Sequence, residues 1–399
     1  MKMTTAMKMI LGSFAVCLAL NALADDPTIG QVTVKQRWPW SRLVDIDYVL
    51  SCDPTQKVDI AISAYNGSTA LMLPTESLSG DLYGISEGAH RIVFDPTKTA
   101  YTNSEVMTKF RVAIAQNPVP VYMIVDLTKS AGAGGQIEYI YPGDARLETY
   151  GRFTNVWFGV TNDSVYATDK FVLRRVSAGS YGMGDNVNIP VTLTKDFYVS
   201  VFELTETQWF KIMGSGSMST KPKVNVSYDD IRGSTNNMPV INWYTTGSTV
   251  GATNFMGVLR SRTIMSTFDL PTEAQWEYVC RAGTTTYFSD GITGSSTNQL
   301  NDLGWWNGNC VSLQLVGQKM ANNWGLYDTH GNAIEWSLDW EGTRVGGSDP
   351  AGAVSGIGRV TRGGSWRNPA TSCRSSGRSL SGVSGRTDFI GFRVVRNLP

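Results

Sequence analysis

Cysteine and histidine, the residue types best suited to metal and redox chemistry, are scarce in this chain. Its 399 residues include only two histidines, His90 and His330. Two imidazoles cannot build a zinc or iron centre that needs three, so such centres are excluded. Apart from Cys17 near the amino terminus, the cysteines are Cys52, Cys280, Cys310 and Cys373. Four cysteines permit at most two disulfides, which is too few for the main scaffold of so long a chain.

A second group of residues could recognise a ligand. The run Gly363-Gly364-Ser365-Trp366 places flexible backbone beside a hydroxyl group and a large ring, which suits either the floor of a cleft or a tight packing turn. The chain from there to Phe392 is rich in short hydrogen-bonding side chains, which together with tryptophans favour a carbohydrate, peptide or protein ligand. The predicted cleft residues are Trp306, Trp336, Trp366, Asn368 and Arg374. A solvated irregular loop is the alternative for this segment, and the spacing of Trp336 and Trp340 also fits a buried pair.

Two segments that could position these residues carry the start and stop signals of a helix. In each, a threonine is followed three residues later by a glutamine, which predicts a capping box at Thr205 and at Thr272. A glycine, Gly214 or Gly283, predicts the end of each segment. The rest of this half is rich in Gly, Ser, Asn and Trp, so we expect an α+β fold whose long loops are held by buried aromatic rings and hydrogen bonds.

Residues 25–116 predict a small antiparallel β-sandwich. Apolar side chains alternate with more polar ones from Val44 to Leu50, and turn-forming pairs such as Asn66-Gly67 and Asp95-Pro96 separate such runs. Short strands at this spacing are typical of an immunoglobulin-like sandwich. Residues 117–170, with two prolines at their start and a glycine-rich run, are expected to form a connector with short strands. A second domain would then occupy residues 171–399.

The first 24 residues have the features of a cleaved signal peptide. Lys2 and Lys8 precede an apolar run from Met9 to Leu20, and small residues at Ala22 and Ala24 precede an acidic pair. The run is too short to span a bilayer. We therefore expect a secreted or periplasmic protein that is not integral to a membrane. The net charge is zero and no basic run occurs, which excludes nucleic acid as the partner.

Several motifs follow one another in a fixed order through residues 171–399. They are Ala178–Gly184, Glu203-Leu204-Thr205, Met238-Pro239-Val240, Asn242-Trp243, Leu270–Tyr278, Trp324–Asp328, Gly331–Trp336, Arg362–Trp366 and Gly391–Val394. In this order the motifs resemble the formylglycine-generating-enzyme (sulfatase-modifying factor) family. The resemblance implies a variant of the C-type lectin fold. The expected fold class is therefore α+β, with a C-type-lectin-like domain preceded by the β-sandwich.

The resemblance also implies a calcium site. Asp328, Gly331, Ala333 and Glu335 match the family positions that offer two side-chain and two main-chain oxygens to calcium. Such an oxygen-only set suits a hard cation. A capped loop with a solvated Glu335 is the alternative, because spacing alone does not define coordination.

The catalytic residues implied by the resemblance are incomplete. Active members of the family use molecular oxygen and copper(I), held by two cysteines five residues apart, to convert a sulfatase cysteine to formylglycine. In this chain Cys373 matches the second cysteine and Ser365 the preceding Gly-Gly-Ser motif, but the first cysteine position is Asn368. An amide is a hard neutral donor that cannot replace a thiolate for copper(I).

These departures leave two functional interpretations open. If the family chemistry is retained, Cys373 and Ser365 are catalytic, copper(I) is the cofactor and a sulfatase is the partner. Asn368, together with Ile334 where active enzymes have a tryptophan, favours instead an exported, degenerate member that binds a ligand without catalysis. A disulfide between Cys280 and Cys373 is a further alternative, and it would remove the last candidate copper ligand.

Overall fold

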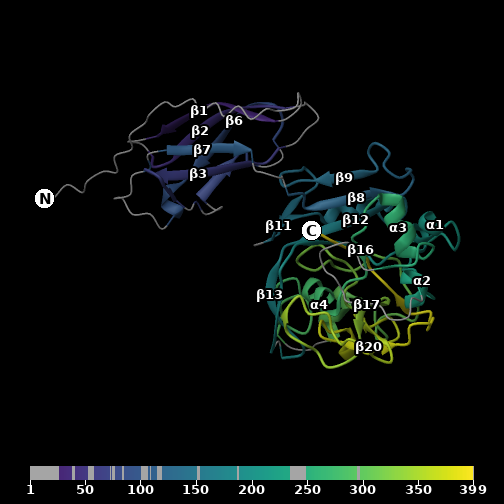
Figure 1. Ribbon diagram of the computed structural model, residues 1–399. Helices are drawn as coiled ribbons and strands as arrows, with labels where there is room; N and C mark the ends of the chain where they lie inside the picture. Colours follow the sequence, from purple (N-terminus) through teal and green to yellow (C-terminus); the bar gives the residue numbers. More distant parts are fainter. Residues whose placement is uncertain are drawn as a thin grey trace. The chain divides into compact units, whose positions relative to one another are not determined.

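The structure is a computed structural model in which the chain forms two compact units (Figure 1). The described residues are 27–37, 41–52, 58–71, 73, 77–82, 85–99, 107, 109–114, 119–150, 153–186, 188–233, 249–293 and 297–398. The predicted signal peptide and the motifs at 238–243 lie outside these ranges. Within the described parts of the chain, no helix combines the length and the apolar character that a membrane span requires.

The first unit is built from two antiparallel sheets. One has the order β1 (Thr28–Gln36), β2 (Val44–Ser51), β6 (Gly88–Phe94) and β5 (Leu78–Gly80). The other has the order β4 (Thr69–Leu71), β3 (Ile60–Asn66) and β7 (Lys109–Ile114). One apolar core, with Val44, Ile46, Ile60 and Ile92, contains residues from both sheets. The sandwich expected from the alternating pattern is therefore present.

The second unit contains a six-stranded sheet with the order β16-β22-β15-β12-β8-β9. These strands are β16 (Phe268–Asp269), β22 (Val395–Asn397), β15 (Phe197–Ser200), β12 (Lys170–Val176), β8 (Tyr122–Asp126) and β9 (Ile137–Ile140). The short strands expected in residues 117–170 include β8 and β9, but β8 pairs antiparallel with β12 over five residues, so this stretch belongs to the second unit and not to a connector. The second unit begins at Pro120, because the strands from 122 to 140 complete its sheet.

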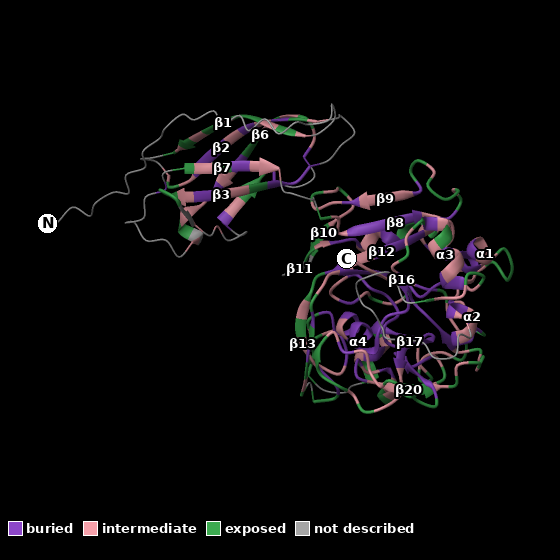
Figure 2. Cartoon of the chain, in the orientation of Figure 1, coloured by how far each residue is buried: buried purple, intermediate pink, exposed green. Residues whose placement is uncertain are grey.

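Smaller sheets complete the second unit. Strands β13 (Gly179–Met183), β14 (Ile189–Leu193) and β18 (Gly347–Ser348) form one, and β10 (Glu148–Tyr150) pairs with β11 (Phe153–Val156). The third has the order β20 (Arg378–Ser381), β19 (Arg359–Arg362), β17 (Ile334–Trp340) and β21 (Ile390–Gly391). Figure 2 shows that β8 and β17 are buried along most of their length.

Five α-helices are described in the second unit: α1 (Glu206–Met213), α2 (Tyr228–Arg232), α3 (Phe255–Thr263), α4 (Glu273–Arg281) and α5 (Thr297–Leu303). Helices α1 and α4 are the two predicted ones, and both begin with the expected capping box. Gly214 ends α1 in the left-handed conformation, whereas Ala282 takes that role after α4. The unit is thus of the α+β class, with short elements and long loops.

Candidate functional site

The segment after β19 forms the turn that the sequence singled out. Gly363 and Gly364 have φ of +92° and +67°, which only glycine adopts without strain. A side chain at Gly363 would lie 2.9 Å from the ring of Trp276, and one at Gly364 would lie 2.7 Å from the sulfur of Cys373. Both glycines are therefore required by close packing as well as by backbone conformation. The turn is buried, and it places the Cys373 thiol directly beneath it.

Asn368 is tied to the turn through Ser365. The Ser365 hydroxyl donates a 2.6 Å hydrogen bond to Oδ1 of Asn368, and the Asn368 amide nitrogen of the backbone donates to Ser365 O at 2.9 Å. The carbonyl of Asn368 accepts from the backbone N–H of Asn307 at 3.2 Å. Ser365 is fully buried. The asparagine thus serves as the hydrogen-bond partner that positions the serine.

Three of the predicted cleft side chains are partly exposed around this turn. Trp306 donates from its indole nitrogen to Asn301 at 2.9 Å, and the Arg374 guanidinium lies 4.0 Å from the ring centre of Tyr287. Trp366 is covered on one face by Arg367, and its indole nitrogen is buried without a hydrogen-bond partner among the described residues. The turn therefore carries aromatic and hydrogen-bonding groups together.

Trp336 does not belong with these residues, and its prediction as a cleft residue is wrong. It is fully buried, donates to Val226 O at 3.1 Å and packs edge-on against Tyr228. Strand β17 is covered on both faces, so every side chain from Ile334 to Asp339 is buried. The alternative prediction from the spacing of Trp336 and Trp340, a buried pair, is correct for Trp336.

Cys280, Cys310 and Cys373 are free thiols, so the predicted alternative of a Cys280–Cys373 disulfide is not formed. Burial raises the pKa of Cys373 to about 12, and the charge of Cys310 acts in the same direction, while a backbone hydrogen bond from Ser365 opposes it. Burial also raises the pKa of Cys280 to about 11. Both buried sulfurs are therefore mostly protonated thiols at neutral pH, a form that is a weaker nucleophile and a weaker ligand for a soft metal than the thiolate.

His330 contacts both buried cysteines as a neutral ring, Cys280 at its sulfur and Cys373 at its carbonyl. Its Nδ1 donates to the carbonyl of Cys373 at 2.8 Å, and its Nε2 accepts from the backbone N–H of Ser289 at 3.1 Å. Burial lowers the pKa of His330 to about 4. The ring nitrogens lie 3.8 and 3.9 Å from the Cys280 sulfur. With both nitrogens already paired, His330 supports the loop that follows Asp328.

Three of the positions predicted to bind calcium lie on that loop and Glu335 follows on β17, but Glu335 is already neutralised. Its two carboxylate oxygens accept hydrogen bonds from Arg393, each at 2.7 Å, and Trp276 donates to one of them at 2.6 Å. One oxygen of Asp328 accepts from Gly317 N at 2.7 Å, while the other is buried without a hydrogen-bond partner. Across the described ranges, no group of three or more His, Cys, Asp or Glu side chains is placed to hold a metal ion.

A calcium ion therefore fits these residues poorly as they are arranged. Oxygen ligands for calcium must keep lone pairs directed at the ion, but the Glu335 oxygens are directed at a guanidinium group. Nearby, Glu203 accepts from Asn332 Nδ2 and Ala333 N, each at 2.8 Å, and burial raises its pKa well above the usual range.

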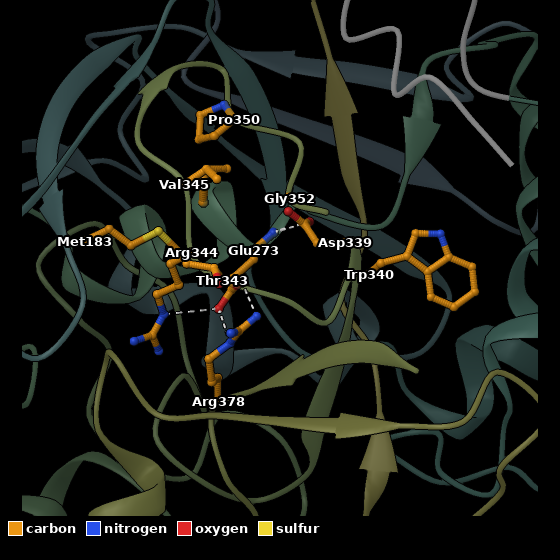
Figure 3. A pocket seen from close by; sticks show the side chains of 11 residues that line it. Met183, Glu273, Asp339, Trp340, Thr343, Arg344, Val345, Pro350, Gly352 and Arg378 are labelled. Atoms are coloured by element: carbon orange, nitrogen blue, oxygen red, sulfur yellow. Dashed lines mark hydrogen bonds and ion pairs between the residues drawn. The ribbon is translucent and has the colours of Figure 1, made fainter. Parts of the chain in front are cut away.

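Sequence reasoning missed a network of glutamates and arginines around α4. Figure 3 shows Glu273 facing Arg344 and Arg378 in a small pocket, with Asp339 at the first turn of the helix. Arg378 lies 2.9 Å from Glu273, and Arg344 lies 3.5 Å from it. Oδ2 of Asp339 accepts from the backbone N–H of Glu273 at 2.6 Å. Because these groups neutralise one another, the network holds α4 against β17 and β20.

The arrangement around the glycine turn can now be compared with known proteins. Residues 160–398 match the model of the family described as the sulfatase-modifying factor enzyme 1-like domain. That match covers more than half of the chain. The chain belongs to this family. Its sulfatase-modifying-factor domain accordingly has the fold that the motifs from Ala178 to Val394 predicted.

Proteins similar to this domain include a chaperone protein and formylglycine-generating enzymes. The chaperone protein LppX of Paenibacillus barcinonensis is 25% identical over 272 residues, which is 59% of this chain and 92% of that protein. The formylglycine-generating enzyme of Streptomyces coelicolor is 33% identical over 151 residues, 32% of this chain and 46% of the enzyme. That of Bos taurus is 30% identical over 160 residues, 32% of this chain and 38% of the enzyme. This chain thus matches less than half the length of either enzyme.

Two solved structures are similar to part of this chain. Treponema denticola variable protein 1 is 24% identical, with 57% of this chain and 95% of that one aligned and a TM-score of 0.45. PvdO of Pseudomonas aeruginosa is 22% identical, with coverage of 57% and 94% and a TM-score of 0.44.

Proposed function

We propose that this chain is an exported, non-catalytic member of its family that binds a protein, peptide or carbohydrate ligand at the face around the glycine turn. That face comprises Trp306, Trp366, Asn368 and Arg374. The observation that carries the proposal is the hydrogen bond between Ser365 and Asn368. It puts a fixed amide at the position where the active family has a copper-binding thiolate.

Copper(I) does not fit the residues that remain. A soft monovalent ion prefers a pair of thiolates, whereas Cys373 is fully buried and its pKa is raised to about 12. Its five-residue neighbour Asn368 already accepts the Ser365 hydrogen bond. Conversion of a sulfatase cysteine to formylglycine is therefore the disfavoured alternative.

The side chains of the proposed face suit recognition. Trp366 is partly exposed beside Arg367, and Trp306 and Arg374 offer a ring and a guanidinium group on neighbouring loops. Rigid aromatic rings supply contact area at low entropic cost, and short polar groups supply adaptable hydrogen bonds. A calcium-dependent lectin mechanism is not part of the proposal, because Arg393 neutralises Glu335.

Two experiments test the proposal. Anaerobic copper(I) titration of the reduced chain should show no tight stoichiometric site, and tight binding that vanishes in Cys373→Ser would restore the oxidase interpretation. Arrays of glycans, peptides and proteins probed with the full chain should yield a ligand whose binding falls at least tenfold in Trp366→Ala and in Arg374→Ala. Met218→Ala, at a side chain 64% exposed, is the matched control. A ligand that binds both variants as tightly as the unmodified chain would contradict the proposed face.

A further inference from the structure

Trp306 connects the surroundings of two thiols from separate segments, Cys310 and Cys373. The backbone N–H and the Sγ of Cys310 both donate hydrogen bonds to Trp306 O, at 3.1 and 3.3 Å. The Trp306 side chain packs against the apolar cluster that contains Cys373, together with Phe288 and Leu300. Trp306 thus contacts Cys310 through its carbonyl and the apolar cluster of Cys373 through its side chain.

The two segments are also joined by their backbones. The Asn307 N–H donates to Asn368 O at 3.2 Å, which ties the loop of Cys310 to the segment that leads into Cys373. Cys373 ends a short 3-10 helix, Ala370–Cys373, whose first residue packs in the same cluster as Trp306. These contacts place the loop of Cys310 beside the segment that ends at Cys373.

Cys280 is the competing partner for Cys373, but it is fixed on a helix in the buried interior. It lies on α4, is fully buried, and its sulfur donates to Thr329 O at 3.4 Å. Cys310 instead lies on a loop outside the helices and strands. Cys310 is also only partly buried, so a soluble oxidant reaches it first.

We propose that Cys310 and Cys373 form a redox pair that a disulfide oxidant converts into an intrachain disulfide. In the first step the Cys310 thiolate attacks one sulfur of oxidised glutathione, and a glutathione thiolate leaves. In the second step Cys373 loses its proton and attacks the sulfur of Cys310, which releases the second glutathione thiolate. Two cysteine thiols are oxidised, one glutathione disulfide is reduced to two thiols, and the atoms and electrons balance.

This inference is independent of the proposed binding function. The disulfide would fix the loop that carries Trp306 against the segment from Ser365 to Cys373. Reduction would release that loop, and the environment's redox state would set how firmly the turn and its neighbouring loop are joined. Such a cross-link stabilises a fold chiefly by restricting the unfolded chain.

The test incubates the full chain with oxidised glutathione, traps free thiols with an alkylating reagent and maps the peptides by mass spectrometry. The expected product joins the peptides of Cys310 and Cys373, and it is absent from Cys310→Ser but retained in Cys280→Ser. Its Tm should exceed that of the reduced chain by roughly 5 °C or more, with no such gain in Cys310→Ser. A Cys280–Cys373 product, a link to Cys52, or glutathione left on Cys310 as a stable mixed disulfide would each overturn the proposal. Because Cys310 is partly exposed, its serine variant should fold even if a Cys373 variant does not.

Discussion

Arg393 donates two hydrogen bonds to Glu335, one to each carboxylate oxygen, and both distances are 2.7 Å. The two side chains are fully buried, with exposed fractions of 0% and 1%. Arg393 also donates to the carbonyls of Ser200 and Tyr327. The pair therefore links β17, the loop before it, the central sheet and the carboxy-terminal segment.

Removing one partner of this pair should destabilise the second unit. Arg393→Met leaves a buried carboxylate without its counter-charge, so we expect a loss of about 3–5 kcal/mol in the free energy of unfolding, measured by urea denaturation. Arg367→Met is the matched control, because its pair with Asp388 is about half exposed, at 48% and 50%. The control should change the free energy by about 1 kcal/mol or less. Equal losses in both variants would contradict the structural role of the Glu335–Arg393 pair.

The same pair predicts how the chain responds to calcium. Because Arg393 occupies both oxygens of Glu335, a chelator should leave the Tm unchanged, and added calcium should not raise it. Thermal unfolding in calcium and in chelator measures this directly. A Tm that falls in chelator, with the fall abolished in Glu335→Gln and in Asp328→Asn, would support the calcium site expected from the family resemblance.

Asp339 should make stability depend on pH. Burial raises its pKa from 3.8 to about 7, and the charge of Glu273 acts in the same direction while Arg359 opposes it. The folded state therefore holds a proton that the unfolded state has lost between about pH 4 and pH 7, so this residue's contribution to stability falls as pH rises through that window.

Asp339→Asn should remove that contribution. The unmodified chain should lose roughly 2–4 kcal/mol more than the variant between pH 5 and pH 8, measured by urea unfolding at both values. Asp388→Asn, on an exposed loop, is the control and should follow the unmodified chain. Parallel pH profiles for the unmodified chain and Asp339→Asn would mean that Asp339 does not retain its proton in the folded state.

The sequence predicts an element well where local chemistry alone defines it. Helices α1 and α4 were predicted because Thr205 and Thr272 form capping boxes, which need only residues three apart. Helix α3 was missed because Asn254 makes no side-chain cap hydrogen bond and the helix ends at Ile264 in the left-handed conformation. Glycine usually takes that position, so its stop signal is absent from the sequence.

Long-range packing explains the remaining errors. Strand β8 was expected as a short strand of a connector, because the sequence alone does not show that it pairs with β12 in the sheet of the second unit. Trp336 was placed in a cleft because a sequence cannot distinguish a tryptophan that lines a surface from one buried on a doubly covered strand. The partner of Glu335, Arg393, was likewise visible only once distant segments had been brought together.

The glycine turn should tolerate no side chain at Gly364. Its φ is +67°, and an added methyl group would lie 2.7 Å from the Cys373 sulfur, so Gly364→Ala should cost about 2 kcal/mol or more in unfolding free energy. Gly382→Ala is the control, because nothing lies within 4 Å of its added methyl group. Combining Gly364→Ala with Cys373→Ala should recover part of the loss by relieving the clash. Full additivity of the two changes would show that the sulfur is not the limiting contact.

Asn368→Cys should create the thiol pair that this chain lacks. The new sulfur would stand five residues before Cys373, the spacing that holds copper(I) in active members of the family, and Ser365 would lose its 2.6 Å hydrogen-bond partner. We expect anaerobic copper(I) titration to give one tight site in Asn368→Cys and none in the unmodified chain, because two thiolates bind copper(I) far better than one. The measurement is made in a Cys310→Ser background, so that the thiol beside Trp306 cannot contribute, and Asn368→Ser serves as the size-matched control without sulfur. If Asn368→Cys also fails to bind copper, the Cys373 thiol is buried too deeply to act as a ligand, and restoring the missing cysteine is not enough to rebuild the centre.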